Sequence, residues 1–474
     1  MIARMFDRRH VLQNAAVGFG WLAATAMLHQ HAASEERRQP PEGLFTKESP
    51  YHFAPRARRV IFMFMKGGPS QIDTFDYKPL LNKHDGQPLP FDKPRVQFAA
   101  TGNLLASPWS FRQYGQSGIP VSSLFPNVAK YVDDICILNS VYGTNAAHGG
   151  ASLKLHTGSD TFVRPGMGAW VSYGLGTENQ NLPAFITICP TLAHGGVNNW
   201  GSAFLPADCQ GVPLGVASQP STAAQVKYIS NSRWTSTVQR RQLDLLQQLN
   251  KRHSKVSSSS DALEARIASF ELAYRMQAEM PLVQDLSQET AGTLAMYGLD
   301  NPITEDFGRQ CLLARRFAEA GVRFIQITHS DTKVQWDQHS GLKAGHDKNA
   351  AEVDQPIAAL LADLKQRGLL DDTLLLWGGE FGRTPVAQGK DGRDHNPDGF
   401  TMWMAGAGVR GGTRYGATDE FGFYARENKM HIHDVHATVL HLLGLDHKRL
   451  TFRHAGRDFR LTDIAGEVHH GVFS

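Results

Sequence analysis

The chain has 474 residues, of which 41% are hydrophobic and 20% are charged, values that are ordinary for a globular protein with one large domain or two. The net charge of +3 and the pI near 8.6 are too small to indicate a nucleic-acid partner, and no basic stripe with interleaved aromatic residues occurs. The 21 histidines are the unusual feature. We expect some of them to bind metal or transfer protons and the others to be scattered over the surface.

The amino terminus resembles a twin-arginine export signal. Arg8 and Arg9 precede a weakly apolar stretch at residues 15–28, and small residues follow it. The stretch is interrupted by glycines and is shorter than the roughly 20 residues of a membrane-spanning helix, so we predict no stable membrane span. We assign residues 1–34 to an export signal and residues 35–58 to a linker, which predicts a periplasmic or extracellular protein. The alternative is a disordered basic tail.

The first predicted strand covers residues 59–65 and ends in a Gly-Gly-Pro-Ser turn. Its unbroken apolar run is typical of a strand buried on both faces. Ser70 belongs to the turn and Asp73 follows it, an arrangement similar to the opening of a hydrolytic site in an α/β protein. Tight turns use the same residues for backbone reasons, so a structural role for this turn is the alternative.

A second core strand is predicted at residues 135–141, after an irregular excursion over residues 78–120. Small residues around His148 follow this strand, and then a short helix that ends at Thr157-Gly158. We expect the amino end of this helix to face the functional site, because its unpaired N–H groups attract anions.

Apolar side chains recur at helical spacing between about residues 235 and 300. The serine-rich residues 254–260 interrupt the pattern and indicate a flexible break. We therefore predict a helical insertion into the main domain. A separate all-helical domain is the alternative, although its core would be small.

The carboxyl-terminal part alternates between strands and helices. A strand at 322–327, a helix at 350–367 and a strand at 374–377 form the pattern of a βαβ unit, which predicts a parallel sheet. A strand at 402–405 and a helix at 434–443 extend it. Residues 59–474 are thus predicted to form an α/β domain, with a large mostly parallel sheet and helices on both faces.

Polar residues suited to a metal or proton-transfer site gather where these strands end. Open α/β sheets place their ligand sites at the carboxyl ends of their strands. Mixed carboxylate and imidazole ligands suit a divalent metal, and zinc, manganese and calcium are the candidates. The three clusters are Asp337 with His339, Glu380 with Asp394 and His395, and His431 with His433 and Asp434. Turn capping, a solvated loop imidazole and an edge strand are the respective structural alternatives.

Several long blocks resemble a known family. GGPSQIDTFDYKP, HGGASLKLHTG, DLKQRGLLDDTLLLWGGEFGRTP and HDVHATVLHLLGLDH occur in this order, and from about Arg59 onward the chain resembles the domain-of-unknown-function family 1501. That family is related to sulfatases and belongs to the alkaline-phosphatase-like superfamily. The resemblance implies a large sheet with helices on both faces, a nucleophile near a helix amino end, and one or two metals held by Asp and His.

The chain departs from the sulfatase pattern at the positions that carry the chemistry. Sulfatases end the first strand in paired aspartates, where this chain has Lys66, so Asp73 would have to take that role. His148 lies near the place of the residue that sulfatases convert to formylglycine, which argues against a formylglycine sulfatase. Glu380 keeps one carboxylate of the Asp-His pair expected after the late strand, and His395 would supply the imidazole.

The first functional hypothesis is an exported, metal-dependent hydrolase that acts on a sulfate or phosphate ester of a small molecule or a polysaccharide. Ser70 or Thr144 would be the nucleophile unless a metal-bound water replaces it. His148 would be acid or base, and Arg383 would pair with the anionic substrate. The metal ligands or proton carriers would be Asp73, Asp337, His339, Glu380, Asp394, His395 and His433.

Two further hypotheses keep the fold and change the activity. A non-catalytic envelope protein is suggested by the altered first aspartates and by the missing nucleophile of the superfamily. An isomerase or mutase of the same superfamily would need a phosphosugar substrate, and nothing in the sequence names one.

Overall fold

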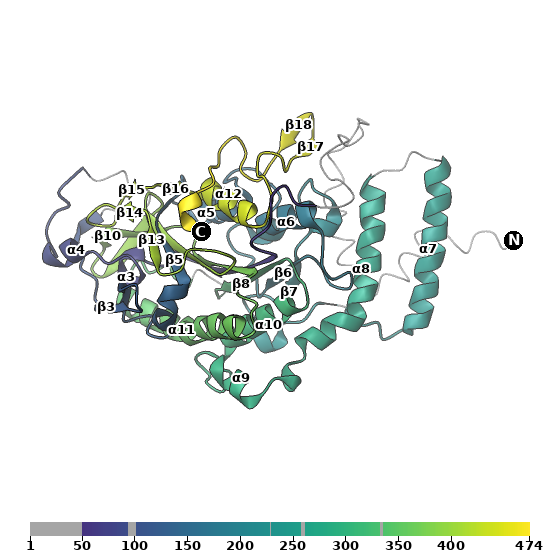
Figure 1. Cartoon of the computed structure of the whole chain (residues 1–474), viewed down its shortest axis with the longest axis horizontal. Coiled ribbons are helices and arrows are strands. Elements are labelled where there is room, and N and C mark those ends of the chain that lie inside the picture. Colours follow the sequence, from purple (N-terminus) through teal and green to yellow (C-terminus); the bar gives the residue numbers. More distant parts are fainter. Residues whose placement is uncertain (1–49, 93–100, 228, 257–260, 332–334) are drawn as a thin grey trace.

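The computed structural model describes residues 50–92, 101–227, 229–256, 261–331 and 335–474 (Figure 1). The predicted export signal lies outside the described residues, as does the predicted linker up to residue 49. Within the described part of the chain, no helix has both the length and the apolar character needed to cross a membrane.

A nine-stranded sheet forms the centre of the molecule, with the order β13-β5-β12-β9-β1-β8-β6-β7 and with β16 also paired to β5. Only β12 runs antiparallel to its neighbours in this sheet, β5 and β9. The strands are β1 (Arg59–Met65), β5 (Ile135–Tyr142), β6 (Phe185–Ile188), β7 (Val212–Leu214), β8 (Phe324–His329), β9 (Thr373–Gly378), β12 (Phe400–Ala405), β13 (Thr413–Tyr415) and β16 (Met430–His431). The prediction of a large, mostly parallel sheet is confirmed.

Helices cover both faces of this sheet, because its central strands are apolar on both sides. In β1, Phe62 packs into one buried cluster and its neighbour Met63 into another, as the alternation of strand side chains requires. On the Phe62 side lie α5 (His148–Thr157), α6 (Met167–Leu175) and α12 (Ile432–Leu442), and on the Met63 side lie α10 (Glu305–Glu319) and α11 (Leu342–Gln366) (Figure 1). The predicted helices on both faces are therefore also confirmed.

A smaller sheet, which sequence analysis did not predict, lies beside the main one in the segment after β9. Its strands are β10 (Gly382–Gln388), β11 (Gly392–Asn396) and β2 (Thr101–Leu104). Asp394 and His395 are neighbours in β11, and both are buried. The polar character of this segment hid its two strands from sequence analysis.

The segment predicted to be an irregular excursion also contains short elements. Its four-residue strands, β3 (Phe111–Tyr114) and β4 (Ile119–Ser122), are too short to produce a visible sequence period, and α4 (Pro79–Lys83) precedes them.

Short elements also occur elsewhere in the chain. They are α3 (Gln71–Thr74), β14 (Ala417–Thr418), β15 (Ala425–Glu427), β17 (Phe452–His454) and β18 (Arg457–Phe459).

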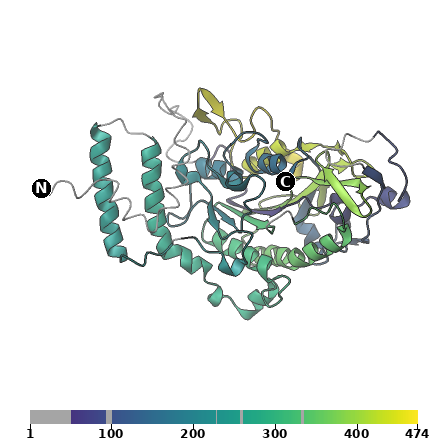
Figure 2. The same cartoon turned by 180° about the vertical axis from the view of Figure 1, so that it is seen from behind.

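The segment with the helical repeat folds into α7 (Ser236–Val256), α8 (Asp261–Gln284) and α9 (Ala291–Met296). Two of these helices, α7 and α8, stand side by side at the end of the molecule opposite β10 (Figures 1 and 2). Met276, Met280 and Val283 of α8 are buried in the same core cluster as α10 and α11. This segment is therefore joined to the main core through α8.

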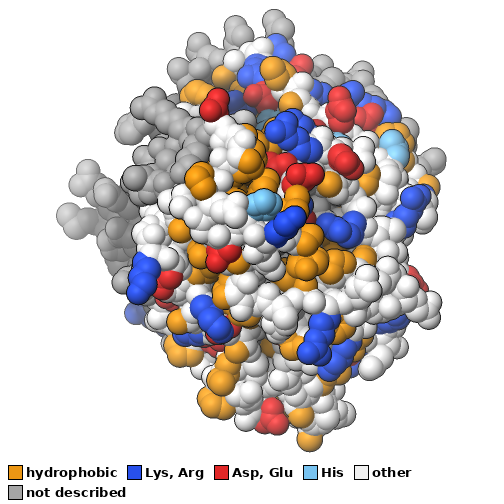
Figure 3. Space-filling model, turned by 90° about the vertical axis from the view of Figure 1, so that its left-hand side faces the viewer, with side chains coloured by type: hydrophobic (Ala, Val, Ile, Leu, Met, Phe, Trp, Pro, Cys, Tyr) orange, Lys and Arg blue, Asp and Glu red, His pale blue; other side chains and the backbone are white. Residues whose placement is uncertain are grey.

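The end of the molecule that carries α4 and β10 faces the viewer in Figure 3. Positive and negative side chains are interspersed on that face. The described side chains on this one face do not form a continuous basic surface.

Candidate metal centre

The carboxyl ends of β1, β8 and β9 meet at one edge of the sheet. Met65 is in register with His329 of β8, and Phe64 with Gly378 of β9. The three loops that follow are then joined by backbone contacts. Gly67 N–H donates to both carboxylate oxygens of Glu380, at 3.0 and 3.1 Å, and Trp336 N–H donates to the Lys66 carbonyl at 3.1 Å.

Gly67 is a position where the loops after β1 and β8 approach closely. Its φ of +111° is unfavourable for any residue with a side chain, and an added Cβ would lie 2.6 Å from Trp336 N and 2.8 Å from Asp337 N. Only glycine therefore lets the β1 loop pass beneath the loop that carries Asp337.

We expect Gly67→Ala to lower the free energy of unfolding by about 1–3 kcal/mol and to weaken metal binding by displacing Asp337. Gly86→Ala is the matched control, because Gly86 has a similar left-handed φ of +73° with open space around it. It should cost only about 1 kcal/mol and leave metal binding unchanged. Urea denaturation and metal titration measure the two effects, and equal results for both variants would show that the close approach is unimportant.

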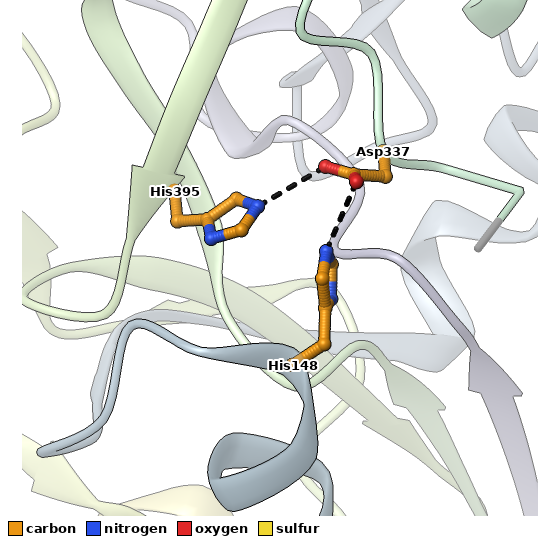
Figure 4. A group of neighbouring side chains, drawn as sticks. All are labelled: His148, Asp337 and His395. Atoms are coloured by element: carbon orange, nitrogen blue, oxygen red, sulfur yellow. Dashed lines mark hydrogen bonds and ion pairs between the residues drawn. The ribbon is translucent and has the colours of Figure 1, made fainter. Parts of the chain in front are cut away.

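Three side chains from different elements meet above this edge (Figure 4). His148 begins α5, Asp337 follows β8, and His395 comes from β11. His148 Nε2 lies 3.2 Å from Asp337 Oδ2, and His395 Nε2 lies 3.1 Å from Asp337 Oδ1. The two imidazoles therefore flank the two oxygens of one carboxylate.

The opposite nitrogen of each imidazole is also held. His148 Nδ1 lies 2.6 Å from Glu380 Oε1, and His395 Nδ1 lies 2.6 Å from the Ala146 carbonyl oxygen. Glu380 is itself fully buried. A proton on each Nδ1 satisfies these acceptors, and in the neutral ring the lone pair is then on Nε2, facing Asp337.

Asp337 is surrounded by cationic and hydrogen-bonding groups. Arg383 Nη2 lies 2.7 Å and His339 Nε2 lies 2.9 Å from its Oδ1. Burial alone would raise the pKa of Asp337, but the contacts with His148, His339, His395 and Arg383 outweigh it and hold that pKa far below its usual range. The carboxylate is ionised at any physiological pH.

His148 and His339 respond to the same carboxylates. Burial lowers the pKa of His148, but its hydrogen bonds to Asp337 and Glu380 outweigh burial and raise that pKa overall. The hydrogen bond to Asp337 raises the pKa of His339. Burial of Glu380 would raise its pKa, but its bond to His148 outweighs burial and lowers that pKa. The negative charges of Asp337 and Glu380 thus favour the protonated forms of His148 and His339.

His148, Asp337 and His395 fit a divalent metal. Their donor atoms lie within 4.8 Å of one another. A tetrahedral ion with bonds of about 2.0–2.1 Å separates neighbouring donor atoms by about 3.3 Å, close to the 3.1 and 3.2 Å between the two imidazoles and Asp337. Among the described residues, buried His148 Nε2 has its 3.2 Å contact with Asp337 and no other polar partner. Three ligands with an open fourth position are typical of catalytic zinc.

A second group of possible ligands shares His395 with the first. It contains His339, Asp394 and His395, whose donor atoms also lie within 4.8 Å of one another. Asp394 Oδ2 is buried and has no hydrogen-bond partner among the residues that the structure describes. Because imidazole nitrogens make up much of both groups, the donor set suits zinc or manganese better than calcium, which takes oxygen ligands.

All members of the two groups except Asp394 line an open cavity of about 540 Å³, large enough for a small-molecule ligand. Its walls are formed by Ala147, His148, Gly149, His194, Asp337, His339, Gln388 and His395.

His194 is a cavity residue that sequence analysis missed. It is exposed, its backbone has a left-handed φ of +52°, and its ring stacks on His148 with 5.2 Å between centroids. Buried Lys66 donates to the preceding Ala193 carbonyl at 2.9 Å. Burial lowers the pKa of Lys66 to about 8, although Glu380 opposes the effect. Lys66 was the available signal for a contact here, because it directly follows an apolar strand and lysine is rarely buried without partners. Sequence alone does not identify its partner as the segment that carries His194.

Ser70 and Asp73 do not line the cavity, contrary to their expected roles as nucleophile and metal ligand. Both are fully buried, and Ser70 Oγ donates to Asp73 Oδ2 at 2.5 Å. Asp73 also pairs with Arg393, whose Nε and Nη2 lie 2.7 and 3.2 Å from its oxygens. These contacts use the polar groups of both side chains and hold α3 against the smaller sheet.

Arg383 and His433 are also placed differently from expectation. Arg383 is fully buried and donates to the Gly68 carbonyl at 2.9 Å and to the Gly67 carbonyl, so it orients Asp337 and the β1 loop rather than a substrate. His433 lies on α12, where its Nε2 contacts the Gly158 carbonyl at 2.7 Å. Neither residue lines the cavity, and exposed Thr144 does not line it either.

Comparison with known proteins gives one family match and several remote structural similarities. A family model described as "Protein of unknown function (DUF1501)" matches residues 57–473. No curated protein matches the chain.

Three solved structures represent the structural similarities. The lipoteichoic acid synthase LtaP from Listeria monocytogenes has 11% identity and a TM-score of 0.36, with 85% of this chain and 76% of that chain covered. The PsFucS1 sulfatase from Pseudoalteromonas sp. has 13% identity and a TM-score of 0.34, covering 82% and 68%. The alkaline phosphatase from the Antarctic bacterium TAB5 has 8% identity and a TM-score of 0.35, covering 83% and 99%.

Proposed function

The chain belongs to the family of proteins of unknown function DUF1501, and from this premise and the geometry of its metal centre we propose that it is a metal-dependent hydrolase of sulfate or phosphate esters. One observation carries the proposal. His148 and His395 both direct Nε2 at Asp337, while Glu380 and the Ala146 carbonyl hold their Nδ1 atoms. Histidines that bind metal have such outer partners.

The residues of the centre have separate roles in this proposal. A divalent ion bound by His148, Asp337 and His395 would supply a Lewis acid for the ester oxygens and a lowered pKa for a water molecule. Glu380 keeps His148 Nε2 available by accepting the Nδ1 proton, and Arg383 fixes the orientation of Asp337. His339 lies on the cavity wall, where its imidazole would serve as the acid that protonates the leaving oxygen.

The lining of the cavity favours water as the nucleophile. It contains no serine, threonine or cysteine among the described residues. The hydroxyl and thiol groups that most often act as covalent nucleophiles are thus missing from the lining. Direct hydrolysis, with ester substrates of small molecules or polysaccharides, is therefore the reaction we propose. The twin-arginine-like amino terminus supports a site of action outside the cytoplasm.

The test is metal analysis of the purified protein together with a panel of aryl sulfates and aryl phosphates. We expect about one or two zinc or manganese ions per chain, and turnover of one ester class that a chelator abolishes and added metal restores. His395→Ala should lose both metal and turnover while remaining folded. A folded wild-type protein that binds no ion and hydrolyses neither class would instead support the non-catalytic hypothesis.

A further inference from the structure

Helix α7 is the outermost element at one end of the molecule. In both views α8 stands between α7 and the body of the protein (Figures 1 and 2). One side of α7 therefore packs on α8, and no described helix or strand covers its other side in either view.

Polar contacts fix which side of α7 faces inward. Arg240 Nη1 and Nη2 bind the two carboxylate oxygens of Glu271 on α8 at 2.7 and 2.8 Å. Gln247 Nε2 also donates to Glu271, at 2.6 Å, and Gln277 Nε2 of α8 donates to Gln239 Oε1 at 3.0 Å. The rotation of α7 about its own axis is set by these bonds.

This rotation turns two leucines away from the protein. Leu245 is 56% exposed and Leu249 is 43% exposed. They are one helical turn apart and lie on the side opposite Arg240 and Gln247. Trp234, just before the helix, is 41% exposed. A surface helix normally turns its leucines toward the core, so these exposed side chains are an unpartnered apolar face.

The apolar face is accompanied by positive charge. Arg241 and Arg252 are exposed on α7 and lie within about 60° of the direction midway between the two leucines around the helix axis. Arg233, beside Trp234, is also exposed. Asp244, a described carboxylate on the flank of this face, lies 2.8 Å from Arg240, which also pairs with Glu271.

We propose that the outer face of α7 binds an anionic membrane surface, with the leucines inserted at the headgroup level and the arginines against lipid phosphates. A helix with an apolar stripe flanked by arginines has the character of an interfacial membrane-binding helix. A second copy of the chain fits this face less well, because a two-fold contact would bring the arginines of the two α7 helices together. The binding is independent of the metal centre, which lies among the strand ends of the main sheet.

The experiment is co-sedimentation of the folded protein with vesicles of phosphatidylcholine alone and with vesicles that also contain phosphatidylglycerol. We expect binding to the second kind only, weakened by added salt. Leu245→Glu combined with Leu249→Glu should reduce that binding at least about tenfold. Leu282→Glu is the control, because Leu282 is 66% exposed and lies on α8, off this face; it should bind as the wild type does.

Arg241→Gln combined with Arg252→Gln tests the electrostatic part and should reduce both the binding and its salt dependence. Circular dichroism establishes that each variant keeps its helices. Absence of binding to both vesicle types would overturn the proposal, as would equal losses in the α7 and Leu282 variants. A wild-type dimer that the leucine variant converts to monomer, with unchanged vesicle binding, would assign the face to a second copy instead.

Discussion

Asp337→Asn is expected to lower both the affinity for a divalent metal and the rate of ester hydrolysis by about a hundredfold or more. Asp337 is the side chain that both candidate imidazoles face, so its charge is central to the donor set. The amide keeps the shape of the carboxylate but removes that charge. Metal titration of the purified variant measures the affinity for the metal, and kcat/KM measures the rate of ester hydrolysis.

The control for this variant is Asp371→Asn, which removes the same charge from an exposed position before β9. It should change neither the metal affinity nor kcat/KM. Arg383 loses its ionic partner in Asp337→Asn but keeps the Gly68 and Arg393 carbonyls as acceptors, so a thermal melt should still show a folded protein. A folded Asp337→Asn variant with wild-type metal affinity would remove Asp337 from the metal centre.

The sequence was sufficient for the sheet because its central strands are continuous apolar runs. Residues 59–65 were predicted as a strand buried on both faces, and β1 has the same bounds. Parallel strands bring their carboxyl ends to one edge, so side chains placed after different strands were expected near one another. Asp337, His339 and His395 do lie together at this edge.

The rest of the site depends on contacts that no local pattern encodes. Asp73 follows β1 at the same edge, yet a charged partner from β11, far along the chain, removes it from the cavity. His194 lies in a segment without regular structure and with a left-handed backbone, so neither helical nor strand periodicity marks it. Burial of Arg383 likewise follows from the backbone carbonyls that surround it, which the sequence does not place.

Arg393→Met is expected to lower the free energy of unfolding by about 3–5 kcal/mol, the largest stability effect of these variants. Arg393 and Asp73 both have side chains with 0% exposure, so the variant leaves a buried carboxylate without its cation. The Leu105 carbonyl, a 3.0 Å acceptor of Arg393, also loses its donor. Urea denaturation measures the loss, and Arg453→Met is the control, because its pair with Asp458 is exposed and should contribute less than about 1 kcal/mol.

Asp73→Asn separates a structural role for this carboxylate from the role of a metal ligand. If Asp73 only balances Arg393, the variant should be destabilised, while its folded form keeps a metal affinity within about twofold of the wild type. Metal titration without denaturant, at a temperature well below the melting point of the variant, measures the affinity of the folded form alone. A loss of affinity as large as that expected for Asp337→Asn would return Asp73 to the metal centre, and would mean that Arg393 competes with the ion for it.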